Sequence, residues 1–171
     1  VAFYKACLAE GIKPIIGCEV YVAPRTRFDK DHTVDAEYTH LILLCKNETG
    51  YKNLCYLVSA AFTEGFYIKP RIDWELLHGH AEGLVCLSGC VAGAIPRMLC
   101  AGNYEQAKAK AIELNELFGE GNFYLEIQDH DLEIEKKAAE GLLRLHRETG
   151  IPLAVTNDAH YIEKDDAYYQ D

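Results

Sequence analysis

The apolar run Ile151-Pro152-Leu153-Ala154-Val155 is followed directly by Thr156-Asn157-Asp158-Ala159-His160-Tyr161. An apolar, β-prone run that comes after a helical pattern is typical of a buried strand. If the chain stays extended beyond that strand, Asp158 and His160 point the same way, because residues two apart share a face. A carboxylate and an imidazole that project together are suited to half of a metal site. In the alternative interpretation, both side chains lie in a surface loop and bond to backbone.

Upstream of this stretch, apolar strand-like runs alternate with helical patterns. The strand-like runs cover residues 13–22, 38–45, 83–87, 122–127 and 151–155. Helical patterns cover residues 1–11, 48–64, 74–80, 93–101, 103–118 and 132–149, and a further helix begins near residue 164. Such alternation predicts an α/β fold with a mostly parallel sheet, either open or closed into a barrel. Functional sites in these folds lie at the carboxyl ends of the strands.

Polar residues mark the expected starts of three helices. Asp73, Asn103 and Asp131 each precede a helical pattern and can accept hydrogen bonds from its first backbone N–H groups. Gln106 lies three residues after Asn103 and is placed for a capping box. The polar, charged stretch 23–37 predicts a loop.

Composition limits the classes of function. With 171 residues and 49% hydrophobic content, the chain can bury a core of about one domain, spanning residues 1–171. It contains no apolar run of about 18 residues and no basic-then-apolar signal layout at its start, so we expect no membrane association. Seven cysteines without a C-x-x-C pair favour a reducing, cytoplasmic setting.

The net charge of −10 argues against a nucleic-acid-binding face on this domain alone, because phosphate affinity requires clustered Lys and Arg. An acidic cluster that holds cations fits this charge balance. Acidity that serves only solubility is equally compatible with it.

Three further side chains are candidate ligands. Glu19 interrupts an apolar strand, so its carboxylate needs either a metal or a salt bridge to Lys or Arg. His40 precedes the apolar run 41–44, where a lone histidine is usually a core residue whose ring nitrogens are hydrogen-bonded within the protein. It also lies at the start of its predicted strand, which is the wrong end for a barrel site. Cys90 follows the strand-like run 83–87 and presents a thiol after a turn.

The chain also resembles a known family. The strings that carry the resemblance are Gly11-Ile12-Lys13-Pro14-Ile15-Ile16-Gly17-Cys18-Glu19-Val20-Tyr21-Val22-Ala23-Pro24, Thr39-His40-Leu41, Asn47-Glu48-Thr49-Gly50-Tyr51-Lys52-Asn53-Leu54, Glu64-Gly65-Phe66-Tyr67-Ile68-Lys69-Pro70-Arg71-Ile72-Asp73, Leu87-Ser88-Gly89-Cys90, Asn122-Phe123-Tyr124-Leu125-Glu126-Ile127-Gln128-Asp129-His130 and Thr156-Asn157-Asp158-Ala159-His160-Tyr161. In this order they resemble the polymerase-and-histidinol-phosphatase (PHP) domain at the front of bacterial DNA polymerase III alpha subunits of the DnaE type. The resemblance covers essentially the whole chain.

The resemblance implies a distorted parallel (β/α) barrel with a metal cluster at one mouth. The family's ligands match Glu19, His40, Cys90, Asp158 and His160, which overrides the positional argument against His40. A site with thiolate and imidazole ligands favours zinc, with manganese or magnesium as alternatives. His130 is a candidate for contacting a metal ligand or a substrate.

The sequence also departs from the family pattern. The H-x-H motif and the T-D-H-G-like motif of the family are absent, so we expect a barrel that is incomplete at its N-terminus. The polymerase palm is absent as well. We therefore expect residues 1–171 alone to show no polymerase activity and little or no phosphoesterase activity.

Two functions remain open for the domain. One is a metal-dependent phosphoesterase that acts on a DNA 3′ end or on pyrophosphate. The other is a non-catalytic scaffold that supports the polymerase and docks a proofreading subunit. The resemblance implies as partners DNA and nucleotides, through the full-length polymerase, and other polymerase III holoenzyme subunits, including the proofreading subunit and the sliding clamp. A free-standing phosphatase of the histidinol-phosphate type is the weakest alternative, because the strings match the polymerase family.

Overall fold

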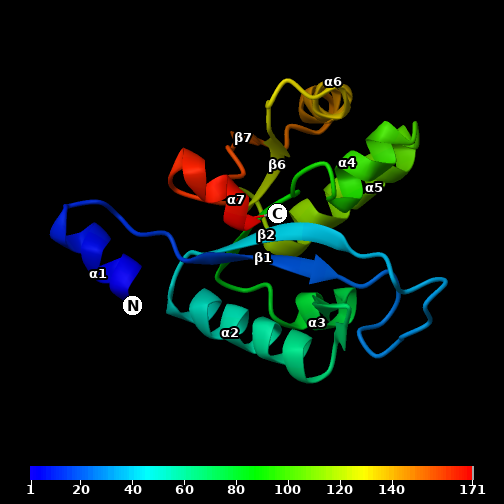
Figure 1. Cartoon of the computed structure of the whole chain (residues 1–171). Helices are drawn as coiled ribbons and strands as arrows, with labels where there is room; N and C mark the ends of the chain where they lie inside the picture. The colour runs from blue at the N-terminus through cyan, green and yellow to red at the C-terminus, as the bar shows by residue number, and fades with distance from the viewer. Residues whose placement is uncertain (171) are drawn as a thin grey trace.

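A seven-stranded sheet runs through the computed structural model of the chain, which describes residues 1–170 (Figure 1). The strands are β1 (Gly17–Val22), β2 (Thr39–Cys45), β3 (Phe66–Tyr67), β4 (Lys69–Ile72), β5 (Leu84–Leu87), β6 (Phe123–Ile127) and β7 (Leu153–Val155). Their order across the sheet is β3-β4-β1-β2-β5-β6-β7. Strands β3 and β7 form the two edges, so the sheet is open and consistent with part of a barrel.

Most of the strands point in one direction. Strand β1 is parallel to β4, and β5, β6 and β7 are parallel to one another. Strand β2 lies between β1 and β5 and is antiparallel to both, which gives β1 and β5 the same direction. Only β2 and the two-residue β3 are therefore reversed among the seven strands. The predicted mostly parallel α/β sheet is confirmed.

The helices are α1 (Ala2–Ala9), α2 (Glu48–Thr63), α3 (Trp74–Gly79), α4 (Ala94–Cys100), α5 (Tyr104–Phe118), α6 (Glu133–Thr149), the 3-10 turn η1 (Lys164–Asp166) and α7 (Ala167–Gln170). Helices α2 to α6 contribute buried side chains to the core on one face of the sheet. Helix α2 packs against β1, β2, β4 and β5, whereas α5 and α6 pack against the β5–β6 side. Figure 1 shows α2 and α3 below β1 and β2, with α4 to α6 beside β6. Helix α1 buries no residue and stands apart from the sheet.

The alternation of side chains along the central strands separates a core face from a polar face. In β1, Val20 and Val22 are buried in the main hydrophobic core together with Leu41 and Leu43 of β2. Glu19 therefore projects from the opposite face of the sheet, because successive strand side chains alternate. The candidate site lies on this second face, opposite the main hydrophobic core.

Several predicted boundaries are wrong, and two strands were not anticipated. Strand β1 begins at Gly17 rather than at residue 13, although the Ile16 carbonyl still accepts a hydrogen bond from the backbone N–H of Cys45 at the end of β2. The two unanticipated strands are β3, which has only two residues, and β4, which contains Pro70. The helix expected near residue 164 appears as η1 followed by α7, and Asp171 lies outside the described residues.

One of the three predicted helix caps forms as expected. The Asp73 carboxylate accepts a hydrogen bond from the backbone N–H of Leu76 and caps α3. Asn103 is the N-cap of α5 but makes no side-chain cap bond, so the predicted capping box is absent. Helix α6 begins at Glu133 after Leu132, because Asp131 takes a left-handed φ of 64° instead of capping.

No helix within residues 1–170 is long and apolar enough to span a lipid bilayer. All seven cysteines are free thiols, which agrees with the expected absence of a disulfide framework.

A buried arginine organises the long connection between β1 and β2. The Arg71 side chain is completely buried, and its guanidinium donates to the backbone carbonyls of Asp35 at 2.8 Å, Asp29 at 2.9 Å and Gly65 at 3.2 Å. Arg25 forms a bidentate pair with the carboxylate of Asp35, whose side chain is fully buried. The loop 23–38 is thus held by charge-assisted hydrogen bonds rather than by an apolar core of its own.

We expect Arg71→Ala to destabilise the fold by about 3 kcal/mol or more, because three backbone carbonyls, two of them in buried residues, lose a charged donor. Urea unfolding monitored by circular dichroism measures this change. Arg147→Ala, at an exposed position of α6, is the matched control and should change stability by less than about 0.5 kcal/mol. Equal stability of the two variants would contradict the role given to Arg71.

Candidate metal centre

The reversed direction of β2 places His40 beside the carboxyl ends of the parallel strands. His40 is the second residue of β2, and it pairs with Tyr21 near the carboxyl end of β1. In an antiparallel pair, the start of one strand lies beside the end of the other. The argument that His40 lies at the wrong end of its strand is therefore wrong, since that argument assumed a parallel β2.

Glu19, His40 and Cys90 converge at this edge. His40 Nδ1 lies 2.6 Å from Glu19 Oε1 and 3.6 Å from Cys90 Sγ. The ring of Tyr21 packs beside His40, with the two ring centroids 5.0 Å apart. The three candidate ligands come from β1, from β2 and from the loop after β5, and they meet around a single imidazole nitrogen.

The loop that carries Cys90 fits closely against the start of β2. The backbone N–H of His40 donates to the carbonyl of Ala92 at 3.2 Å, and Gly93 N–H donates to the Cys90 carbonyl at 2.8 Å. Gly89 has a φ of +83°, and a Cβ at this position would lie 2.7 Å from the His40 carbonyl oxygen. Position 89 therefore requires glycine for both conformation and space.

Asp158 and His160 lie together, but not on an extended strand. Strand β7 ends at Val155, and Asp158 takes a left-handed φ of 53° that breaks the strand alternation. The chain turns so that His160 Nδ1 is 2.7 Å from the Asp158 carbonyl oxygen and 3.9 Å from Asp158 Oδ1. The predicted pairing of the two side chains is thus formed by a turn, and the expected extended geometry is wrong.

His130 supports the loop before Asp158 and is not in contact with Cys90 or Glu19. Its Nδ1 lies 2.8 Å from Glu135 Oε1, and its Nε2 lies 2.8 Å from the Asn157 carbonyl oxygen. The hydrogen bond to Glu135 raises the pKa of His130, and the bond to Asn157 adds to this effect. A protonated ring donates to both acceptors at once. His130 therefore joins the start of α6 to the segment after β7.

Charges within the site favour an imidazolium–carboxylate pair. The pKa of His40 is raised to about 9. The hydrogen bond to Cys90 contributes most to this rise, and the hydrogen bond to Glu19 contributes the next most. The hydrogen bond from His40 lowers the pKa of Glu19 against the opposing effect of burial. The charge of His160 lowers the pKa of Glu19 further, which places the 158–160 turn within electrostatic reach of the first cluster.

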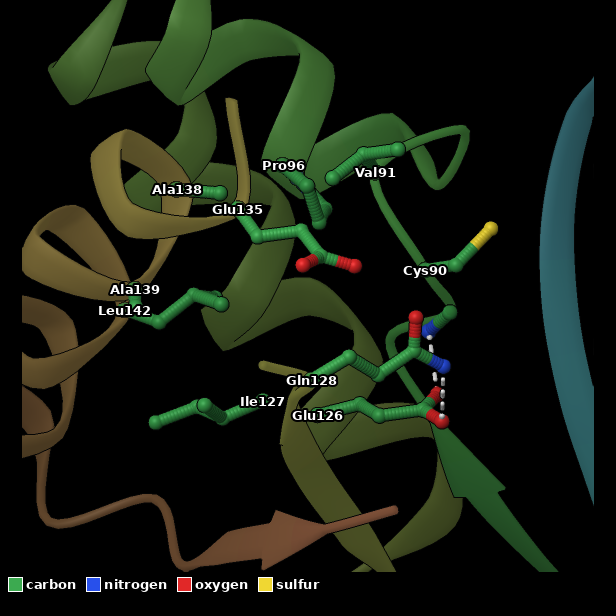
Figure 2. A pocket seen from close by; sticks show the side chains of 11 residues that line it. Cys90, Val91, Pro96, Glu126, Ile127, Gln128, Glu135, Ala138, Ala139 and Leu142 are labelled. Carbon is green, nitrogen blue, oxygen red and sulfur yellow. Dashed lines mark hydrogen bonds between the residues drawn. The ribbon is translucent and has the colours of Figure 1, made fainter. Parts of the chain in front are cut away.

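A buried carboxylate that the sequence interpretation missed lies between the two clusters. Glu126 in β6 is only 4% exposed, and burial raises its pKa. Figure 2 shows its carboxylate beside Gln128 and below Cys90 in a small cavity. The available signal was a Glu inside the apolar run 123–127, which is the same pattern that drew attention to Glu19.

The donor atoms suit a zinc ion in kind. Carboxylate, imidazole and thiolate are its usual ligands. Within the part of the chain that the structure describes, however, no three His, Cys, Asp or Glu side chains are arranged to hold a metal ion. The 2.6 Å between Glu19 and His40 is a hydrogen-bond distance, whereas two ligands of one zinc lie about 3.3 Å apart. Metal binding would replace this hydrogen bond and move the two side chains slightly apart.

Comparison with known proteins places the chain in a family. The PHP domain model matches residues 1–130. The chain is 55% identical over 170 residues to DNA polymerase III subunit alpha of Treponema pallidum (strain Nichols), a match that covers 99% of this chain and 14% of that protein. The same subunit of Borreliella burgdorferi is 44% identical over 172 residues, covering 100% of this chain and 15% of the relative.

The subunit of Thermus aquaticus is 46% identical over 169 residues, which cover 98% of this chain and 14% of that protein. The chain thus spans about one seventh of the length of these relatives. It belongs to the PHP domain family and is homologous to the PHP region of DNA polymerase III alpha subunits.

Proposed function

We propose that the chain is part of the PHP domain of a bacterial replicative DNA polymerase, the DNA polymerase III alpha subunit, which synthesises DNA on a template in the cytoplasm. The family match and the identities of 44–55% to such subunits support this proposal. In that protein, DNA and nucleotides, the proofreading subunit and the sliding clamp are the proposed partners.

Within this domain we propose a divalent metal site of Glu19, His40, Cys90, Asp158 and His160, with zinc as the preferred ion over manganese and magnesium. The observation that carries the proposal is the contact of Glu19, His40 and Cys90 on the face of the sheet opposite the main core. Acidic, imidazole and thiol side chains from three separate segments meet there. Residues that only stabilise a core have no need of this combination.

The chemistry proposed for the site is hydrolysis of a phosphoester or of pyrophosphate, of the 3′–5′ exonuclease or pyrophosphatase type. Bound divalent metals supply an activated water and a charge that holds a phosphate oxygen. Glu19, His40, Cys90, Asp158 and His160 would hold the metal, and His130 contacts the segment that carries Asp158. Because the net charge is −10, an approaching phosphate needs this cationic centre.

A scaffold that supports the polymerase and docks a proofreading subunit is the second candidate. The arrangement favours it in one respect: Glu19 and His40 already satisfy each other through a hydrogen bond. Such a closed pair is stable without an added ligand.

A nuclease assay separates the two functions. In the full-length polypeptide that carries this domain, we expect chelator-sensitive release of nucleotides from a 3′-labelled primed DNA, or of phosphate from pyrophosphate. Asp158→Asn should reduce this release by at least about 100-fold, because a proposed ligand is lost. Asp165→Asn, at an exposed position of the same segment, is the control. Full activity of Asp158→Asn would exclude hydrolysis at this site, and absence of activity in the unchanged protein would favour the scaffold.

Metal preference tests the role of Cys90. We expect Cys90→Ala to lower bound zinc more than bound manganese, because a thiolate favours zinc while manganese prefers oxygen ligands. Metal content after dialysis is measured by mass spectrometry of the full-length polypeptide. Cys55→Ala changes an exposed thiol on α2 and should leave both metals unaffected. Equal loss of zinc and manganese, or no loss, would remove Cys90 from the ligand set.

The pKa of His40 predicts how metal-free stability depends on pH. Because the pKa rises on folding from 6.5 to about 9, the stabilisation is complete below pH 6.5 and is lost as the pH rises through 9. We therefore expect metal-free protein to lose stability between pH 6.5 and pH 9 in urea titrations. His40→Gln should remove this component, and His32→Gln, at an exposed position, should retain it. The same pH slope in His40→Gln would show that another group titrates.

A further inference from the structure

Glu126 is the most deeply placed charge near the candidate site, and it accepts hydrogen bonds from three different segments. Gly89 N–H donates to its Oε2 at 3.0 Å from the loop after β5. The Thr156 hydroxyl donates to its Oε1 at 2.5 Å from the end of β7. The Gln128 amide donates to the same oxygen at 3.2 Å from the end of β6.

The strand backbone reinforces this junction. The backbone N–H of Glu126 donates to the Ser88 hydroxyl oxygen at 2.9 Å, and Ser88 is 1% exposed. The Gln128 amide also donates to Thr156 Oγ1 at 3.2 Å. Burying a carboxylate is costly unless it is fully hydrogen-bonded, and here every bond of the carboxylate comes from a loop or strand end beside the site. A role in general packing would be served by an apolar side chain without this cost.

The partners of Glu126 lie next to the two halves of the candidate centre. Gly89 immediately precedes Cys90, and Thr156 lies two residues before Asp158. On its other side, the Cys90 loop is tied to His40 through Ala92. Glu126 thus links the cluster around His40 to the turn that carries Asp158 and His160. Figure 2 shows its carboxylate in the small cavity below Cys90.

We propose that Glu126 is a positioning residue that holds the Cys90 loop and the Asp158–His160 turn in their relative placement at the edge of the sheet. It contacts no substrate or metal itself. It acts through Gly89 and Thr156, because its buried carboxylate accepts a hydrogen bond from each of them. This inference rests on the proposed metal site for its metal-binding consequence, but the placement of the Cys90 loop does not depend on that site.

The test combines two variants with a matched control in the full-length polypeptide. Glu126→Gln keeps the size of the side chain but replaces one acceptor oxygen by a donor NH2 group. Thr156→Val keeps the shape but removes the hydroxyl donor. Glu148→Gln is the control, because Glu148 also accepts from two different side chains, Lys108 at 2.7 Å and Arg144 at 2.8 Å, but far from the site on α6.

The first readout is zinc affinity, measured by competition with a chromophoric chelator. We expect Glu126→Gln to weaken zinc binding by about 10- to 100-fold, as is typical when a group that orients metal ligands is lost. Thr156→Val should give a smaller loss. The double variant should lose less than the two single losses combined, because both changes break the same link. Glu148→Gln should leave the affinity unchanged.

The second readout is independent of metal. In chelator, the limiting rate of iodoacetamide alkylation at high pH is measured for each cysteine by mass spectrometry. We expect Cys90 to react several-fold faster in Glu126→Gln, while the exposed Cys55 serves as an internal reference and is unchanged. If the unchanged protein binds no zinc, the proposed function fails and this readout alone decides the inference. The positioning role of Glu126 would be overturned if Cys90 in Glu126→Gln were alkylated at the wild-type rate. It would also be overturned if Glu126→Gln and Glu148→Gln changed zinc affinity equally.

Discussion

The reversed direction of β2 is the constraint on which the candidate site depends. The connection from β1 to β2 does not cross back over the sheet, so β2 starts beside the carboxyl end of β1. His40 is thereby placed beside the carboxyl ends of the parallel strands. The polar contacts of Arg71 and Arg25 fix the loop that makes this reversal. The position of a proposed ligand is therefore set in part by hydrogen bonds in a loop that contributes no proposed ligand, although its last residue, Tyr38, stacks on the His40 ring with the centroids 5.8 Å apart.

The site is a set of competing hydrogen bonds. Glu19 and His40 satisfy each other as an ion pair, while Glu126 gathers three donors at a buried point. A metal that enters this network has to displace the proton of His40, whose pKa is about 9. Affinity for the metal is then the difference between the bonds gained and the hydrogen bonds lost. This balance is compatible with both proposed roles of the site, hydrolysis and structural support.

The acidic balance of the domain also constrains how it meets a phosphate. Two arginines of the loop 23–38 are already paired with carboxylates, Arg25 with Asp35 and Arg27 with Glu64 and Asp73. These cations are committed to the fold. Under the proposed function, bound metal supplies the additional positive charge that meets a phosphate.

Local patterns in the sequence were sufficient for most elements. Apolar runs located five strands, because a buried strand needs apolar side chains whatever surrounds it, and Asp73 caps α3 as predicted. Strand β3 was missed because it has only two residues, and β4 was missed because Pro70 and a buried Arg71 are unusual in a strand. Arg71 is buried there because three loop carbonyls surround it, and no local pattern specifies such partners.

For the site, the sequence alone determined which side chains have suitable chemistry, namely Glu19, Cys90, Asp158 and His160, together with His40 once the family resemblance was considered. The tertiary structure decided which of them meet. The direction of β2 depends on pairing with β1 and β5, and the turn at Asp158 depends on a single left-handed residue. Glu126 gains its place from donors 30 or more residues away along the chain. Such long-range contacts arise only in the folded chain, because they are properties of packing and not of any segment by itself.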